Sequence, residues 1–307
     1  MIIDIHAHAY RRPAPFVTRF PTVEQVLQRY DEAGIEKGVL LPVVNPEIYL
    51  PQANEDILDM AAQYPDRIIP WCNIDPRALT HAADAPLDRL LRYYRDLGCK
   101  GLGEVMLNVP LLDPQVQNLF RHAQDVGLPV TFDGSDRVGG DFGLFDEPGL
   151  PQLERTLQRY PDLTVLGHGP VFWIEIERLK PGVVRKPAFQ PDGEQEAWRP
   201  PDGPIREEGA VARMLRRYPN LHGELSDAHF ALARDPGYGA RFLTEFQDRL
   251  LFGTDYCSVG MPFHTLDLLR AWLAEGRILQ PVFDKVTGEN ARILLGLPAP
   301  RPNRPPE

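Results

Sequence analysis

The sequence is poor in cysteine and has no long run of apolar or basic residues. Its three cysteines lack C-x-x-C spacing, so neither a disulfide framework nor a thiolate zinc site is indicated. No stretch approaches the ~18 consecutive apolar residues of a membrane span, and the first residues lack the basic start and apolar run of a secretion signal. These absences exclude a membrane protein and predict a cytoplasmic location.

The charge of the chain is predominantly acidic. Its 307 residues include 33 Lys or Arg against 43 Asp or Glu, for a net charge of -10, and no five basic residues stand together. A surface that tracks phosphates is therefore not expected, and nucleic acid is excluded as the partner. Hydrophobic residues at 43% and charged residues at 25% are ordinary for a globular chain with a sizeable core. We expect a small-molecule substrate as the partner and leave a homodimer open.

Helical patterns end in the same two ways along the chain. Three end at Tyr-Pro-Asp or Tyr-Pro-Asn, where proline stops a helix, and three end directly at a glycine that can take the left-handed turn after a helix. Apolar runs of strand length alternate with the helical patterns. The expected strands lie at about 2–8, 35–44, 67–74, 99–107, 128–133, 163–168, 220–226 and 250–255.

Strict alternation of strands and helices indicates a parallel sheet. Eight units with no sign of chain reversal fit a closed (β/α)8 TIM barrel better than an open doubly wound sheet. No Gly-x-Gly-x-x-Gly follows the first strand, which removes the usual dinucleotide site and weakens the open-sheet alternative. We expect one domain over 1–297 with a C-terminal helix, an insertion at 171–205, and a Pro-rich tail at 298–307. The aromatic start of the insertion favours a lid over the barrel mouth at 171–200.

Two histidines end the first expected strand. His6 and His8 are two residues apart, so both imidazoles should share a face, with Asp4 below them and Ile3, Ile5 and Ala7 turned to the helices. Two neutral imidazoles that converge form half of a metal site. A His-x-His pair alone is a weak signal, because two hydrogen-bonded histidines are the common alternative.

Ligand-type residues also end four other expected strands. Active sites of barrels lie at the carboxyl ends of the strands, where an Asp often only caps the next helix and a Glu is often only salt-bridged. Capping would select Ser, Thr or Asn as readily, so a collection of His, Glu and Asp at one barrel end indicates a metal centre. These residues are Glu104, Asp133, His168 and Asp255.

Several motifs at these positions belong together. They are His6-x-His8, Gly103-Glu104, His168, Gly253-Thr254-Asp255 and the ending Gly-Glu-Asn-Ala-Arg-Ile-Leu-Leu-Gly-Leu at 288–297. Together they resemble the amidohydrolase superfamily, and in particular the amidohydrolase-related branch that contains the aminocarboxymuconate semialdehyde decarboxylases.

This resemblance covers essentially the whole chain. It implies a (β/α)8 barrel with one or two divalent ions, the strand-one histidines and Asp255 as ligands, and His168 near metal or substrate. Gly103-Glu104 also resembles the bridging carboxylate of TatD-like deoxyribonucleases. The sequence departs from the family at the end of strand five, where Asp133 stands in place of the usual histidine.

The expected ligands indicate a chemistry. An ion of zinc type, with manganese as the alternative, lowers the pKa of a water and polarises a substrate carbonyl. Asp255 is then a ligand and a proton acceptor, and His168 is a second catalytic residue. Two interpretations of Asp133 stay open: it binds a second ion, which we favour because two ions balance the carboxylates better, or it caps the turn at Gly134-Ser135.

Three functions are compatible with this site. The first is a metal-dependent hydrolase of an amide, ester or lactone, the second is a metal-dependent non-oxidative decarboxylase of a small carboxylic acid, and the third is a non-catalytic binding protein on the same barrel. The extra carboxylates favour hydrolysis, since they would repel an anionic substrate unless metals neutralise them. The residues expected to bind substrate are Trp173, Asn45, Ser226 and His229.

Overall fold

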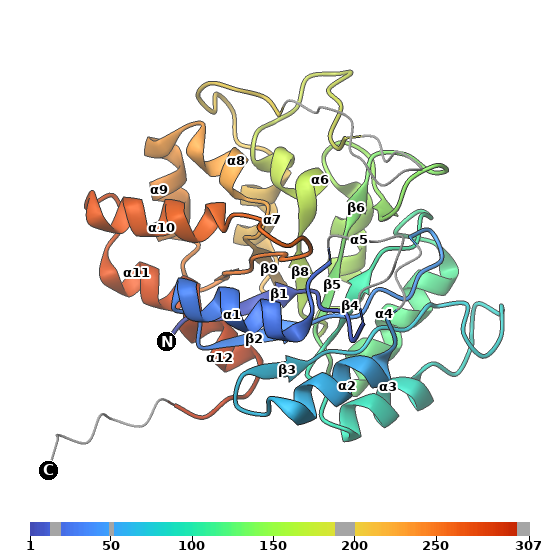
Figure 1. Ribbon diagram of the computed structural model, residues 1–307. Helices are drawn as coiled ribbons and strands as arrows, with labels where there is room; N and C mark the ends of the chain where they lie inside the picture. Colours follow the sequence, from blue (N-terminus) through green and yellow to red (C-terminus); the bar gives the residue numbers. More distant parts are fainter. Residues whose placement is uncertain (13–19, 49–51, 188–199, 300–307) are drawn as a thin grey trace, which may run out of the picture.

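Parallel strands form the centre of the molecule and helices surround them (Figure 1). The computed structural model describes residues 1–12, 20–48, 52–187 and 200–299. The central strands are β1 (Ile3–Ala7), β2 (Lys37–Leu40), β3 (Ile68–Pro70), β4 (Leu102–Val105), β5 (Val130–Phe132), β8 (Val165–Gly167), β9 (Leu221–Glu224) and β10 (Leu250–Leu251).

Two sets of paired strands close into one barrel. The first has the order β1-β2-β3 and the second the order β10-β9-β8-β5-β4, and every pairing within them is parallel. Parallel bridges join Cys72 to Leu102 at one seam and Ala7 to Tyr256 at the other. The closed (β/α)8 barrel predicted from the alternation is confirmed, and the open sheet is excluded.

The helices between the strands end where the sequence predicts. Gly34 and Gly127 follow α1 and α4 with φ values of 67° and 79°, the left-handed conformation that glycine adopts without steric cost. Tyr64, Tyr160 and Tyr218 stand at the C-caps of α2, α5 and α7, each followed by the proline that stops the helix. The helices named here are α1 (Val23–Ala33), α2 (Asn54–Gln63), α4 (Pro114–Val126), α5 (Pro151–Arg159) and α7 (Ala210–Arg217).

The remaining elements complete the outer layer and the two barrel ends. The longer helices are α3 (Asp88–Asp96), α9 (Pro236–Glu245) and α10 (His264–Ala274), and the short ones are α6 (Gly169–Trp173), α8 (His229–Ala233), α11 (Gln280–Asp284) and α12 (Asn290–Leu294). A 3-10 turn, η1 (Ile174–Ile176), and a π-helical turn, η2 (Lys285–Glu289), extend α6 and α11. A small parallel pair, β6 (Gly134–Ser135) and β7 (Leu144–Phe145), follows β5.

An inner apolar cluster fills the amino-terminal part of the barrel. It includes Ile3 and Ile5 of β1 together with side chains of β2, β3, β8 and β10, and Ala291 and Leu295 of the C-terminal helix pack onto it. The expectation for the first strand was wrong here, because Ile3 and Ile5 face this inner cluster and not the helices. The β1–β2 register shifts between Asp4 and Ala7, so the alternation of faces is broken below the histidines.

The segment after β8 is only partly described. Residues 171–187 and 200–205 belong to the described structure, whereas 188–199, and with them much of the predicted lid, lie outside it. Most of the predicted tail, 300–307, lies outside it as well. None of the described helices combines the length and the apolar character needed to cross a membrane. The cytoplasmic location and the homodimer stay predictions.

Candidate metal centre

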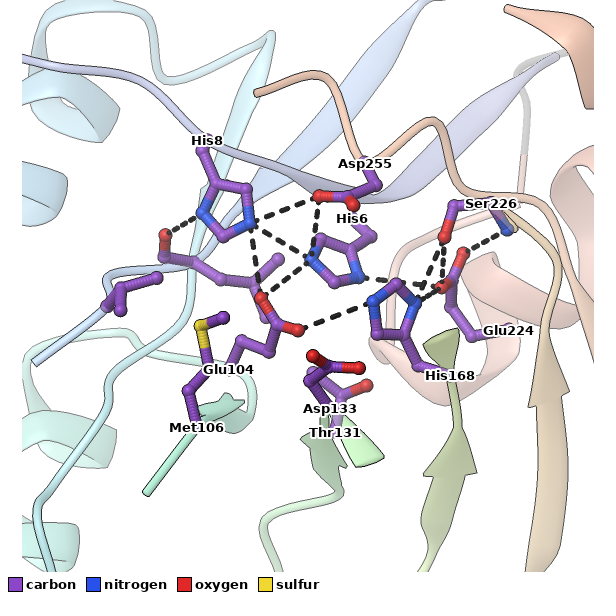
Figure 2. A network of polar contacts seen from close by, with 12 residues as sticks. His6, His8, Glu104, Met106, Thr131, Asp133, His168, Glu224, Ser226 and Asp255 are labelled. Carbon is purple, nitrogen blue, oxygen red and sulfur yellow. Dashed lines mark hydrogen bonds and ion pairs between the residues drawn. The ribbon is translucent and has the colours of Figure 1, made fainter. Parts of the chain in front are cut away.

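Four side chains converge at the carboxyl-terminal end of the barrel (Figure 2). Nε2 of His6 and Nε2 of His8 lie 3.1 Å apart. Oε2 of Glu104 lies 3.5 Å from the first of these nitrogens and 3.4 Å from the second. Oδ1 of Asp255 lies 3.5 Å and 3.3 Å from the same two atoms. We call His6, His8, Glu104 and Asp255 the ligand quartet.

The spacing of the two histidines from each other and from each carboxylate fits a small divalent ion. Zinc binds His nitrogen and carboxylate oxygen at about 2.0–2.2 Å, so neighbouring ligand atoms of a tetrahedral site are separated by roughly 3.3–3.6 Å. The five separations given above fall between 3.1 and 3.5 Å. Two imidazoles and two carboxylates are also the donor types that zinc and manganese accept. The residues present therefore fit a metal ion.

A hydrogen bond fixes which nitrogen of the His8 ring faces the quartet. Nδ1 of His8 lies 3.0 Å from the carbonyl oxygen of Leu41, and Nδ1 of His6 lies 3.5 Å from Oε2 of Glu224. The carbonyl oxygen holds the proton of a neutral His8 ring on Nδ1 and leaves Nε2 as the free acceptor that a metal needs.

Backbone conformation brings each of the two carboxylates to the histidine pair. Gly103, which precedes Glu104, has a φ of 146°, and a Cβ there would meet the backbone of Thr131 at 2.6 Å. Only glycine fits this position. Asp255 has a φ of 47°, in the left-handed region that Asp tolerates better than most residues, and its N–H donates to His6 O at 2.9 Å. The Asp255 side chain is 22% exposed, so the quartet is open on its side.

A second group of residues surrounds His168 beside the quartet. Nδ1 of His168 lies 2.5 Å from Oε2 of Glu224, and the same oxygen accepts a hydrogen bond from Ser226 Oγ at 2.6 Å. Nε2 of His168 faces Oε1 of Glu104 at 3.3 Å. One oxygen of Glu104 thus faces the other members of the quartet, and its second oxygen faces His168.

Asp133 is held by an ion pair. Nζ of Lys186 donates to Oδ2 of Asp133 at 2.6 Å, and Oδ1 of Asp133 accepts the N–H of Gly134 at 2.8 Å. The second bond is the turn cap that was the less favoured interpretation of this residue. Asp133, Glu104 and His168 still have ligand atoms within 4.8 Å of one another, so metal binding by Asp133 is not excluded by distance.

The carboxylates shift the titration of the histidines. Burial lowers the pKa of His6, but Asp255 and Glu104 outweigh it and raise the pKa to about 10. Burial likewise lowers the pKa of His168, while Glu224 and Glu104 raise it well above its usual value. Burial raises the pKa of Glu104, but hydrogen bonds from the histidines hold it well below its usual range. The excess negative charge draws protons to the histidines, and the same charge attracts a metal cation.

A family model with the description Amidohydrolase matches residues 3–297 of the sequence. The chain belongs to the amidohydrolase family. This confirms the resemblance seen in the motifs, and it supports an enzyme of this family acting on a small molecule. No curated protein matches the chain in sequence.

Solved structures from several bacteria share the fold of this amidohydrolase. An uncharacterised TIM-barrel protein from Bordetella bronchiseptica has 19% identity and a TM-score of 0.62, with 96% of this chain and 98% of that chain covered. The 5-carboxyvanillate decarboxylase from Sphingomonas paucimobilis has 14% identity and a TM-score of 0.58, with coverage of 97% and 99%. A protein from Acinetobacter baumannii assigned as a 2-pyrone-4,6-dicarboxylic acid hydrolase has 15% identity and a TM-score of 0.58, with coverage of 96% and 99%. At these identities the likeness shows the fold, and both reaction types occur on it.

The structure corrects two of the predicted substrate-binding residues of the amidohydrolase. Trp173 is 0% exposed, and its Nε1 donates to the carbonyl oxygen of Glu224 at 2.7 Å, so it supports β9 from behind and does not cover the barrel mouth. Asn45 is 1% exposed, and its amide joins Asp75 and the N–H of Met106. It ties loops together and offers substrate no free polar atom.

The other two predicted substrate-binding residues lie nearer the centre. Ser226 is 7% exposed and contacts both Glu224 and His168. His229 begins α8 with a half-buried ring, 4.8 Å from the ring of His264. Their role in substrate binding stays a prediction.

Sequence analysis missed two residues of the site. Glu224 ends β9 in the dipeptide Gly223-Glu224, and the same dipeptide stands within β4 as Gly103-Glu104, so a signal was present. Lys186 lies in the insertion far from any strand end, and no pattern in the sequence marks it. Both missed residues matter for charge, because Glu224 adds an anion to the site and Lys186 adds a cation.

Proposed function

We propose that this amidohydrolase is a metal-dependent hydrolase that opens an amide, ester or lactone bond in a small, uncharged substrate. The observation that carries the proposal is the ligand quartet with its single open side at Asp255. The side chains of His6, His8 and Glu104 are 4% exposed or less, against 22% for Asp255. Substrate and water therefore approach the quartet from the side of Asp255.

His6, His8, Glu104 and Asp255 would hold the divalent ion, which we propose to be zinc. Such an ion supplies Lewis acidity and lowers the pKa of a nearby water toward neutrality. Asp255 accepts the proton of the attacking water as the water oxygen bonds to the carbonyl carbon. It then returns that proton to the leaving nitrogen or oxygen as the scissile bond breaks. His168, with its raised pKa, donates from Nε2 to oxygen that gains negative charge.

The charge around the quartet favours an uncharged substrate. Glu104, Glu224 and Asp255 all lie within 3.5 Å of a ring nitrogen of His6. Lys186 is the cation that pairs with a carboxylate of this neighbourhood, and its donors are used on Asp133 and on two backbone carbonyls. A substrate carboxylate would meet these anions with little compensation, whereas a neutral carbonyl group would not.

A decarboxylase is the second candidate, and His168 is the observation that favours it. A histidine with a raised pKa at the centre can deliver a proton to the carbon that loses CO2, so that the C–C bond breaks and a C–H bond forms. This reaction requires the metal to hold the substrate carboxylate against the surrounding anions.

A product assay separates these functions. The zinc-loaded protein is incubated with neutral amides, esters and lactones and, separately, with aromatic and unsaturated carboxylic acids, while released acid and released CO2 are measured. We expect acid release from the neutral panel, lost in Asp255→Asn. Release of CO2 without hydrolysis would replace the proposal with the decarboxylase. If neither product is released and no metal is bound, a non-catalytic binding protein would be the remaining function.

A further inference from the structure

Lys186 delivers a buried ammonium group next to the metal centre. Its side chain is 3% exposed, and its Nζ lies 2.6 Å from Oδ2 of Asp133, 3.0 Å from Phe142 O and 3.3 Å from Gly134 O. Nζ also stands 3.5 Å from the centroid of the Phe142 ring. Oδ1 of a second buried carboxylate, Asp141, lies 3.8 Å from Nζ. Three hydrogen-bonded oxygens, this carboxylate and one aromatic face surround the ammonium group. A lysine this deeply buried is rare unless it is paired.

The ammonium of Lys186 lies beside a second set of ligand-type atoms, next to the quartet. Asp133, Glu104 and His168 bring one such atom each to within 4.8 Å of one another. Glu104 faces the quartet with Oε2 and faces His168 with Oε1 at 3.3 Å, so its carboxylate stands between two positions for positive charge. The quartet is the first position, and the neighbourhood of Asp133 is the second.

We propose that the ammonium of Lys186 is the permanent cation of this second position, and that the centre therefore binds one metal ion. The proposal rests on the proposed function in one respect, namely that the quartet holds a metal. The ion pair neutralises Asp133 and removes the charge imbalance that would otherwise favour a second ion. A divalent ion beside Asp133 would also meet the repulsion of the adjacent ammonium in a poorly solvated site.

Packing around Asp133 supports the same conclusion. Its second oxygen accepts the N–H of Gly134, and a Cβ at Gly169, whose φ is 81°, would collide with that oxygen. The glycine leaves just the space that the carboxylate fills. Both oxygens of Asp133 are thus engaged, and metal binding would require breaking the bond to Lys186.

The test compares charge at position 186 with the number of ions bound. Lys186→Met keeps the length of the side chain and removes the charge, whereas Lys186→Arg keeps the charge. The double variant Lys186→Met/Asp133→Asn removes the ammonium and its hydrogen-bonded carboxylate, keeps Asp141, and serves as the matched control. Zinc bound per chain is measured by equilibrium dialysis with elemental analysis, over a range of free zinc concentrations.

We expect one bound ion in the wild type, in Lys186→Arg and in the double variant. Lys186→Met should bind a second ion, at least tenfold more tightly than the wild type binds any second ion. Two tightly bound ions in the wild type would overturn the proposal. So would a folded Lys186→Met protein that binds one ion with the same isotherm as the wild type.

A stability measurement covers the case in which Lys186→Met folds poorly because Asp133 is left unpaired. Zinc should then raise the Tm of Lys186→Met in two saturable steps and that of the double variant in one, because the second ion replaces the ammonium. A Lys186→Met chain that stays unfolded at saturating zinc, while the double variant folds, contradicts the proposal. Absence of zinc from all four proteins would instead defeat the proposed function, so the two failures are distinguishable.

Discussion

Oε2 of Glu224 lies 2.5 Å from Nδ1 of His168, which turns the opposite nitrogen of that ring toward the ligand quartet. The same oxygen lies 3.5 Å from Nδ1 of His6. One buried carboxylate at the end of β9 therefore orients the imidazole of His168 and lies close to the imidazole of His6 in the quartet. Carboxylates in this position fix the tautomer of a metal-binding histidine and increase its basicity.

Replacement of Glu224 by Gln should weaken the site without unfolding the barrel. The amide keeps the shape but loses the charge that both rings face, so we expect zinc affinity and kcat to fall by about 10- to 100-fold. Glu208→Gln is the matched control, since Glu208 pairs with Arg216 at the surface. Zinc affinity is measured by competition with a chromophoric chelator. Equal affinity in the Glu224→Gln and Glu208→Gln proteins would show that Glu224 does not act on the metal centre.

Asp4 joins the start of the barrel to its last strand. It is 0% exposed and accepts hydrogen bonds from the N–H groups of His6 and Thr254, from the Thr254 hydroxyl and from Tyr30. Asp4→Asn turns an NH2 group toward these donors, and we expect a loss of about 1–3 kcal/mol in the free energy of unfolding. Tyr30→Phe removes one donor and should cost less. Urea unfolding of the three proteins checks the order, and an Asp4→Asn protein as stable as the wild type would refute it.

His222 makes stability depend on pH. Burial and the nearby Arg249 lower the pKa of this half-buried histidine to about 4, against about 6.5 in an unfolded chain. Between these values the unfolded chain binds more protons, so this contribution to stability is complete above pH ~6.5 and is lost as the pH falls toward 4. His222→Leu should reduce the drop in unfolding free energy between pH 7.5 and pH 5 by about 1–2 kcal/mol. An equal drop in both proteins, measured by urea unfolding, would contradict this.

The barrel could be predicted from the sequence because its signals are local. Glycine at 34 and 127 and proline after Tyr64 act on their own neighbours in the chain, and each stops a helix whatever the rest of the molecule does. The face of β1 below the histidines could not be predicted in this way. Its register shift is set by pairing with β2 and by the partners of Asp4 on α1 and near Thr254.

The residues of the site likewise fall into those that local sequence predicts and those that only the folded chain brings together. The quartet lies at strand ends, where topology alone brings side chains together, so His6 and Asp255 could be expected to meet. The partner of Asp133 comes from position 186, more than fifty residues away in an insertion without regular structure at that point, and only the folded chain places it. The sequence-based preference for two ions rests on the number of carboxylates and takes no account of this cation. Trp173 was misplaced because an aromatic residue after a strand end serves the core as readily as the barrel mouth.

Metal binding by the quartet is tested by the zinc content of the wild type and of His8→Ala after dialysis against the same buffered zinc. We predict about one ion per chain in the wild type and less than about a tenth of an ion in His8→Ala, with the same circular dichroism spectrum in both proteins. A folded His8→Ala protein that retains the full zinc content of the wild type would contradict metal binding by the quartet.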